Sequence, residues 1–192
     1  MDRIILASGS PRRRELLERY GLELKVVNSD IIEKFNTGET PEQISMALAF
    51  SKALSVSKAF SNDIVIGADT IVVYNNNILG KPKNEEDTFR ILSMLSGNVH
   101  DVITGIAIIR AGTNQKIIDY ERTRVKFNNL TPEKINNYII SKESFDKAGA
   151  YGIQGLGAIL VEKIDGCYYN VVGLPLSKID FLLGRYFNFN IL

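Results

Sequence analysis

The chain has 192 residues, which is enough for one globular domain or for two small lobes that share a core. Its 23 basic and 22 acidic residues give a net charge of +1, which excludes bulk attraction to nucleic acid or to a membrane surface. Any electrostatic function must therefore come from local clusters of charge. Cys167 is the only cysteine, so an intrachain disulfide and a cysteine metal cluster are excluded. We expect Cys167 to be a small, half-buried residue in a strand.

No segment approaches the ~18 consecutive apolar residues that a membrane-spanning helix needs. The first residues, "MDRIILAS", contain an apolar run too short for a signal peptide. A single cysteine also fits a reducing compartment. We therefore expect a soluble, cytoplasmic protein without a membrane partner.

In the first part of the chain, strands and helices alternate. Ser10-Pro11 supplies an N-cap and a first-turn proline for one helix, and Gly21 ends it. Thr40-Pro41 begins a longer helix, and the β-branched run "DIVIGADTIVVY" is typical of a central strand. We expect strands at 3–7, 22–27 and 63–74, and helices at 11–20 and 41–60.

The second part begins with a helix that Asn84 caps and that ends near Ser96-Gly97. Two strands joined by the "AGTNQ" turn follow, and Thr131-Pro132 starts another helix. We expect these strands at 99–110 and 116–127, further strands at 159–164 and 168–172, and a C-terminal helix from Gly173-Leu174-Pro175. Since the middle strands form hairpin-like pairs, the pattern predicts an α/β domain, 1–192, with a mixed rather than an all-parallel sheet.

Three arginines follow a Ser-Gly-Ser turn in "LASGSPRRREL", at the start of the first helix. Cations in a first turn oppose the helix dipole, unless an anion binds there. Ser8 and Ser10 lie where backbone N–H groups are free, and Arg12 and Arg13 offer planar donors suited to phosphate. The alternative is an exposed helix start with its arginines in water, which is our expectation for Arg14. No Walker A spacing occurs in the chain.

Asp69 stands inside the apolar strand "IGADTIVV". A carboxylate in such a strand needs a metal, cationic neighbours or a water to act upon, and such residues are frequent at functional sites. A capping or hairpin aspartate at a strand end is the alternative. The small residues Gly67 and Ala68 favour the close approach of a ligand.

Two lysines and a glutamine extend this set. Lys52 lies on the same helical face as Ile44 and Leu48, so its ammonium group either reaches a cleft or extends to the surface. Lys81 is held in the rigid turn "LGKPK". Gln154, in "ESFDKAGAYGIQG", can recognise a base edge or satisfy the local backbone, and Asp146-Lys147 can form an ion pair. The single histidine, His100, favours a role in the core or behind a site, because no nucleophile elbow accompanies it.

Phosphate-binding cations, a candidate base and carboxylates for a hard metal together suit metal-assisted hydrolysis of a phosphoanhydride. The motifs "LASGSPRRRELL", "IGADTIVV", "LGKP", "LSGNVHDVITG", "DKAGAYGIQG" and "YYNVVGLPL" resemble, in this order, those of the Maf family of nucleoside triphosphate pyrophosphatases. This resemblance covers Leu6 to Leu176. It implies an elongated mixed β-sheet flanked by helices, with a cleft between two lobes, as in the inosine triphosphate pyrophosphatases.

The resemblance also implies roles for single residues. Asp69 would be the proton acceptor that activates water, and Glu33 and Asp69 would lie near Mg²⁺ or Mn²⁺, with Asp30 as an alternative to Glu33. The residues that would line the phosphate pocket are Ser8, Ser10, Arg13, Lys52 and Lys81. A homodimer is the assembly that the family suggests.

Three positions distinguish branches of the family. The branch that prefers dTTP and UTP carries the residues found here as Arg12, Thr70 and Gln154. The resemblance therefore implies hydrolysis of dTTP or UTP to the monophosphate and pyrophosphate. Two alternatives come from other classes: a nucleotide-binding regulator of cell division without catalysis, and a nucleic-acid-binding protein. The second lacks interleaved aromatic residues and a basic surface.

Overall fold

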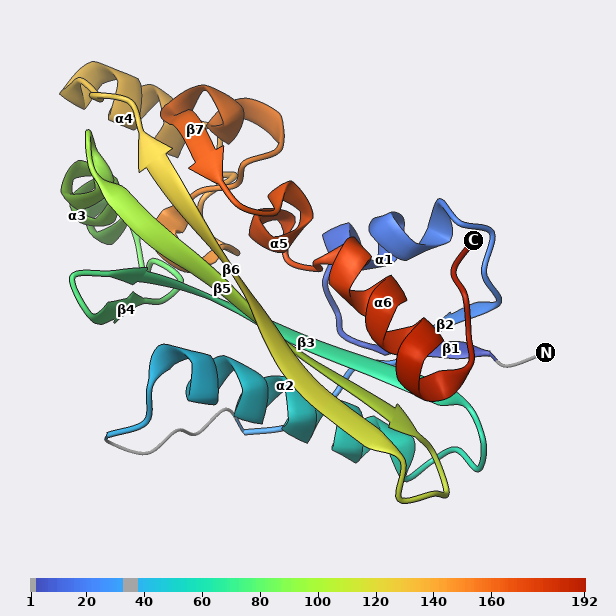
Figure 1. Cartoon of the computed structure of the whole chain (residues 1–192). Coiled ribbons are helices and arrows are strands. Elements are labelled where there is room, and N and C mark those ends of the chain that lie inside the picture. The colour runs from blue at the N-terminus through green and yellow to red at the C-terminus, as the bar shows by residue number, and fades with distance from the viewer. Residues whose placement is uncertain (1–2, 33–37) are drawn as a thin grey trace. The chain divides into compact units, whose positions relative to one another are not determined.

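The computed structural model describes residues 3–32 and 38–192 and shows an α/β fold (Figure 1). Within these residues, seven strands form one mixed sheet in the order β2-β1-β3-β5-β6-β7, with β4 paired to β3. The strands are β1 Ile4–Ala7, β2 Leu24–Val26, β3 Ile64–Tyr74, β4 Asn77–Leu79, β5 Val99–Arg110, β6 Lys116–Phe127 and β7 Val161–Asp165. The helices are α1 Pro11–Glu18, α2 Pro41–Ser57, α3 Glu85–Leu95, α4 Pro132–Ile140, α5 Tyr168–Val172 and α6 Leu176–Phe187. The expected mixed sheet with flanking helices is confirmed.

The chain divides into two compact units. Unit 1 comprises Met1–Asp69, Thr104–Glu121 and Gly173–Leu192, and unit 2 comprises Thr70–Ile103 and Arg122–Val172. Three of the four boundaries fall inside β3, β5 and β6, so each of these long strands contributes residues to both units, and the fourth lies between α5 and α6. No helix in 3–32 or 38–192 has the length and apolar character needed to cross a membrane.

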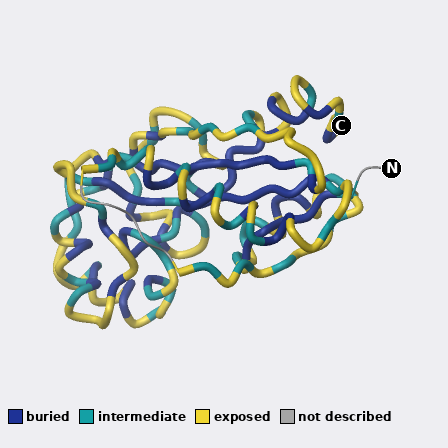
Figure 2. Tube along the Cα trace, turned by 90° about the horizontal axis from the view of Figure 1, so that it is seen from below, coloured by how far each residue is buried: buried dark blue, intermediate teal, exposed yellow. Residues whose placement is uncertain are grey.

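In unit 1, β1 pairs in parallel with both β2 and β3, and Ala7 lies opposite Gly67. Alternate residues of these strands face α2, where Ile5, Ala7 and Val65 pack with Ala49 and Ala53. Helices α1 and α6 lie on the other side of the strands (Figure 1). Strands β1 and β3 are buried along most of their length (Figure 2), as expected for strands covered on both faces, whereas β2 at the sheet edge has no buried residue.

Helix α2 lies unusually close to the sheet. A Cβ atom at Gly67 would come 2.3 Å from the carbonyl oxygen of Ala49, and one at Gly105 would come 2.2 Å from that of Ser45. We expected Gly67 to leave room for a ligand, and this expectation is wrong: the backbone of α2 occupies the space. The helix begins with a capping box, in which Thr40 and Gln43 exchange side-chain to backbone hydrogen bonds.

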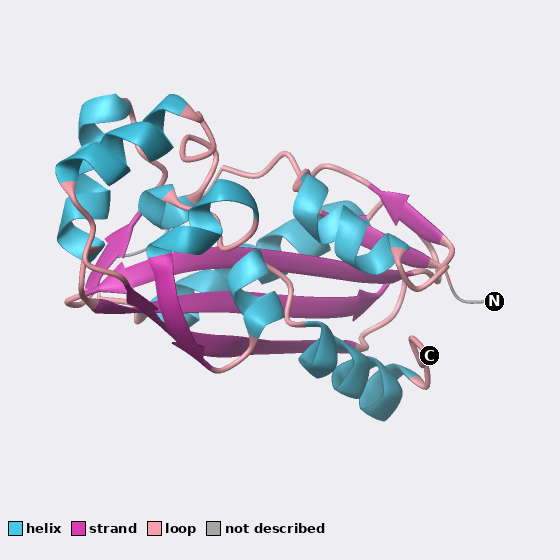
Figure 3. Ribbon diagram, turned by 90° about the horizontal axis from the view of Figure 1, so that it is seen from above, coloured by secondary structure: helices cyan, strands magenta, loops and turns pink. Residues whose placement is uncertain are grey.

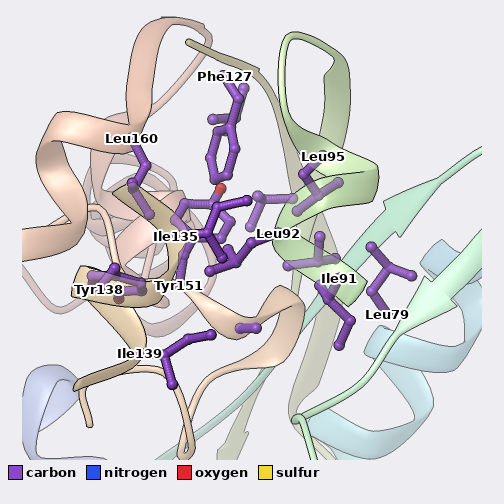
Figure 4. Close-up of a cluster of buried hydrophobic side chains, with 14 residues drawn as sticks. Leu79, Ile91, Leu92, Leu95, Phe127, Ile135, Tyr138, Ile139, Tyr151 and Leu160 are labelled. Carbon is purple, nitrogen blue, oxygen red and sulfur yellow. The ribbon is translucent and has the colours of Figure 1, made fainter. Parts of the chain in front are cut away.

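Unit 2 has its own core. Side chains of α3 and α4 meet Phe127 of β6 and Tyr151 (Figure 4). Helices α3 and α4 lie side by side (Figure 3). His100 is buried in this core, with its ring edge-on to Phe127 and to Tyr151. Its expected place in the core is confirmed.

Residues 168–172 form the short helix α5, so the strand expected there is wrong. The pattern of a five-residue run does not distinguish a strand from a helix, and long-range hydrogen bonds decide the conformation here. The amide of Asn170 donates to the Val102 carbonyl at 2.9 Å and to the Thr123 hydroxyl at 3.0 Å. Cys167 is half-buried as expected, but it precedes α5 and lies in no strand. The strand expected at 159–164 is β7, which begins later because Gly155–Leu160 forms a 3-10 helix.

Candidate functional site

The turn that follows β1 is organised by the hydroxyl group of Ser8. Ser8 is buried, and its Oγ accepts hydrogen bonds from the Ser10 backbone N–H at 3.2 Å and from Nη1 of Arg13 at 3.1 Å. Ser10 occupies the N-cap position of α1 and Pro11 its first turn, as expected, although the Ser10 side chain makes no capping hydrogen bond. The turn is therefore closed by Ser8 rather than by Ser10.

Arg13 bends back over this turn. Its Nε donates to the main-chain carbonyl of Gly173 at 2.7 Å, while Nη1 donates to Ser8. Two hydrogen bonds on adjacent edges fix the plane of a guanidinium group. Arg14 instead pairs with Glu18 at 2.6 Å on the exposed side of α1, as expected for a surface residue. The arginine triplet is thus divided between the turn and the surface.

Asp69 lies beside the same turn. Because β1 and β3 are parallel and Ala7 is opposite Gly67, the chain leaves β1 at Ser8 next to Ala68, one residue before Asp69. Nζ of Lys52 lies 2.5 Å from Oδ1 of Asp69, and both side chains are nearly buried. A cationic neighbour is one of the three partners that the sequence required for this carboxylate. Lys52 reaches it because Ile44 and Leu48, on the same face of α2, are buried against the sheet.

Several of the residues that we singled out, from Thr70 to Gln154, belong to unit 2. Thr70 follows Asp69 in β3 and is half-buried. Lys81 is exposed between Gly80 and the buried Pro82, and the Gly80 carbonyl accepts a hydrogen bond from the Gly149 N–H at 3.1 Å. Gln154 is half-buried in extended backbone before a 3-10 helix. The expected ion pair between Asp146 and Lys147 is present at 2.6 Å.

The described residues contain no group of three or more His, Cys, Asp or Glu side chains that could hold a metal ion. Asp69 is the acidic member of the cluster around the turn after β1. Asp30 is exposed in the loop after β2, and Glu33 lies outside the described residues. Hard cations such as Mg²⁺ take oxygen ligands, and Asp69 is a carboxylate of that kind.

His100 takes no part in this cluster. Its Nε2 lies 2.8 Å from the Tyr151 hydroxyl, and its Nδ1 has no hydrogen-bond partner among the described residues. Burial lowers the pKa of His100 from 6.5 to about 4, so the ring is neutral at pH 7. Burial also raises the pKa of the Tyr151 phenol. The pair is therefore a neutral, structural one.

Comparison with known proteins assigns the family. The profile described as "Maf-like protein" matches residues 3–186. The chain belongs to the Maf family. Among its relatives, the dTTP/UTP pyrophosphatase of Clostridioides difficile (strain 630) is 50% identical over 98% of this chain and 97% of its own length. That of Alkaliphilus oremlandii (strain OhILAs) is 52% identical over the full length of both chains.

A third relative and a solved structure complete the comparison. The dTTP/UTP pyrophosphatase of Bacillus cereus (strain ATCC 14579) is 50% identical over 93% of both chains. Among solved structures, the Staphylococcus aureus Ham1 protein is 17% identical and matches with a TM-score of 0.48 over 83% of this chain and 80% of its own. That likeness is too remote to assign a function.

Two features of this Maf chain were missed in the sequence. One is the Gly173 carbonyl that orients Arg13, and the other is Glu143, whose carboxylate accepts a hydrogen bond from the Leu156 N–H at 3.1 Å. Both lie inside or beside the Maf motifs "YYNVVGLPL" and "DKAGAYGIQG". The glycines at these places were the available signal in the sequence. In the structure Gly155 and Gly173 both adopt a positive φ, a backbone conformation that favours glycine.

Proposed function

We propose that the protein is a nucleoside triphosphate pyrophosphatase that hydrolyses dTTP and UTP to the monophosphate and pyrophosphate. The observation that carries this proposal is the contact of Lys52 with Asp69 beside the turn that holds Arg13, in a chain that matches dTTP/UTP pyrophosphatases over its full length. Cations next to a nearly buried carboxylate are what hydrolysis of a triphosphate needs, because charge must be neutralised where water is activated.

The phosphates would bind to the cations and to the turn after β1. Arg13 is already oriented by Ser8 and Gly173, so it loses little freedom on meeting a phosphate. The backbone N–H groups at the start of α1 add donors for an anion. We assign Ser8, Ser10, Arg13, Lys52 and Lys81 to phosphate binding.

Asp69 would take the proton from the attacking water. A bond forms between the water oxygen and the α-phosphorus, and the bond from that phosphorus to the bridging oxygen breaks, so pyrophosphate leaves. In the free protein Lys52 holds Oδ1 of Asp69. A triphosphate oxygen would compete for the ammonium group and free the carboxylate to act as a base.

A divalent cation fits this site when it arrives with the substrate. Mg²⁺ in nucleotide sites is held by one or two carboxylates together with phosphate oxygens, and Asp69 can supply one carboxylate. Glu33, which lies outside the described residues, is our second candidate, and Asp30 is its alternative. When bound, Mg²⁺ or Mn²⁺ would neutralise charge on the triphosphate.

We assign the choice of base to Arg12, Thr70 and Gln154. Gln154 carries both a donor and an acceptor, and its amide can pair with the edge of a pyrimidine. A site built to hydrogen-bond one base rejects others because its polar groups are then left unpaired. We also propose a cytoplasmic homodimer that does not bind nucleic acid, in line with the charge balance and the single cysteine.

The test is a nucleotide panel with product identification. Purified protein is incubated with dTTP, UTP, GTP and ATP in the presence of Mg²⁺, Mn²⁺ or EDTA, and pyrophosphate and orthophosphate are measured separately. Reaction in ¹⁸O-labelled water identifies the phosphorus attacked, because the label enters the monophosphate only if water attacks the α-phosphorus. Binding of dTTP without pyrophosphate release would contradict the proposal and favour a non-catalytic regulator.

A further inference from the structure

The loop that carries Gln154 is fastened by side chains that come from one neighbouring stretch of unit 2. Oε1 of Glu143 accepts the Leu156 N–H at 3.1 Å, and the Tyr138 hydroxyl accepts the Gly152 N–H at 3.2 Å. Lys147 completes the arrangement, since its Nζ is held by the Glu143 carbonyl and by Asp146. Gln154 therefore lies between two anchored backbone groups, two residues from each.

Two glycines of the loop are explained by the same side chains. A Cβ atom at Gly152 would lie 2.8 Å from Cε of Lys147, and one at Gly155 would lie 2.7 Å from Oε1 of Glu143. Gly155 also has φ near 65°, a conformation that other residues adopt only with strain. The loop thus runs directly over Lys147 and Glu143, with no space between them.

Burial alone does not hold the second half of this loop. Tyr151 and Ile153 are buried, whereas Leu156 is 58% exposed and Gly155 is exposed as well. The hydrogen bond from the Leu156 N–H to a carboxylate is charge-assisted, and such bonds are stronger than those between neutral groups. Glu143 is therefore the group that determines the path of the backbone directly after Gln154.

We propose that Glu143 is a positioning residue for nucleotide selection: it holds the backbone after Gln154 so that the Gln154 amide meets the base in one orientation. This inference rests on the proposed function, in which Gln154 reads the base. A glutamine on a loosened loop would lose freedom on binding and would accept a wrong base more readily. The chemistry at the phosphates, which we assign to other residues, would continue.

Three substitutions of Glu143 separate the possible contributions of its side chain. Glu143→Gln keeps an oxygen acceptor at the same reach and removes the charge, whereas Glu143→Asp keeps the charge and shortens the reach. Glu143→Ala removes both. Glu162→Ala, an exposed carboxylate on β7, is the matched control. Each full-length variant is assayed for kcat and KM with dTTP, UTP and GTP, for amide hydrogen exchange over 152–157, and for melting temperature.

We expect Glu143→Ala and Glu143→Asp to raise KM for dTTP about tenfold and to lower the preference for dTTP over GTP about tenfold. Their kcat should stay within about twofold of the wild type, with faster exchange at Leu156. Glu143→Gln, which keeps the acceptor and loses the charge, should fall between the wild type and Glu143→Ala, whereas Glu162→Ala should resemble the wild type. Should Glu143→Ala fail to fold, the comparison of Glu143→Asp with Glu143→Gln carries the test.

Three results would overturn the inference. The first is an unchanged base preference in Glu143→Asp despite faster exchange at Leu156, and the second is a Glu143→Gln variant that is as defective as Glu143→Ala. A uniform fall of kcat for all nucleotides would also overturn it, because it would place Glu143 in the chemistry. A wild-type protein that hydrolyses none of the nucleotides would contradict the proposed function instead. Hydrogen exchange over 152–157 would still report whether Glu143 holds the loop, so the two failures can be told apart.

Discussion

Asp69 is the base in the reaction that we propose, and burying its carboxylate also costs the protein stability. Its carboxylate lies in a buried strand with Lys52 as an ion-pair partner at 2.5 Å. Removing one member of a nearly buried pair leaves the other uncompensated, so changes at this position affect stability as well as the activity that we propose for it. An isosteric change is therefore the sharpest probe, because Asn keeps the shape and a hydrogen-bond acceptor for Lys52.

We predict that Asp69→Asn lowers pyrophosphate release from dTTP by about 10³-fold, since a general base contributes about 10²- to 10⁴-fold. Binding of dTTP, measured by calorimetry, should persist because Arg13 and Lys52 remain. Asp165→Asn, which changes an exposed aspartate on β7, serves as the control and should keep full turnover. Undiminished turnover by Asp69→Asn would remove Asp69 from its assigned role.

His100 gives the protein a pH-dependent stability that is separate from the site. Its pKa is about 4 in the folded protein against an ordinary 6.5, because burial disfavours the charged ring. Between these values the unfolded chain binds a proton that the folded chain does not, so stability falls as pH drops from 6.5 toward 4. The contribution lost is about 3 kcal/mol, from a shift of this size.

We predict that His100→Gln flattens this part of the profile, because glutamine does not titrate. Urea unfolding of wild type and variant at pH 7.5, 5.5 and 4.5 measures the effect. The difference in their unfolding free energies should be constant above pH 7 and shrink as the pH falls. A difference that stays the same at pH 4.5 would mean that His100 titrates normally in the folded protein.

Single residues show where sequence reasoning succeeds and where it ends. The chemical types at Ser8, Arg13, Lys52 and Asp69 could be identified, because a misplaced cation or a carboxylate in a strand is visible in a pattern. The carbonyl of Gly173 could not, because every residue has a carbonyl and this one lies 160 positions from Arg13. Which distant carbonyl accepts a hydrogen bond from a given side chain is determined only when the chain folds.

At the scale of elements, the approach of α2 to the sheet determines where Lys52 lies. Gly67 and Gly105 let the backbone of α2 come into contact with β3 and β5. The contact between Lys52 and Asp69 depends on that close approach. The bounds of α3 and the start of α4 followed closely from their caps, and β5 and β6 match the two strands expected on either side of the "AGTNQ" turn. Helix α5 did not, because the hydrogen bonds of Asn170 to Val102 and Thr123 override its β-branched sequence.

We predict that Gly67→Ala destabilises the protein by about 1–3 kcal/mol, because the new Cβ overlaps the Ala49 carbonyl and the helix must move. Moving α2 also displaces Lys52 from Asp69, so dTTP turnover should fall with stability. Gly80→Ala is the control, since nothing lies within 4 Å of its added Cβ. Equal unfolding free energies for the two variants, measured in urea, would show that α2 tolerates the shift.

At the scale of the whole molecule, the chain path ties the two units together. Unit 1 is assembled from three segments and unit 2 from two, and β3, β5 and β6 each run without a break from one into the other. A domain that can fold alone normally has its boundaries in exposed linkers, whereas here three of the four fall within strands. Separating the units would require cutting three strands of one hydrogen-bonded sheet.

We therefore predict that both units unfold in one transition, since the loss of β3, β5 or β6 in one unit removes strand partners in the other. Two tryptophan reporters test this, because the chain has no tryptophan of its own: Phe60→Trp in unit 1 and Phe89→Trp in unit 2, both at half-buried positions. Their fluorescence should give the same urea midpoint, which should also match that of the circular dichroism signal. Separate midpoints would show two independently stable units, and the strands that cross the boundary would then fray without unfolding the whole chain.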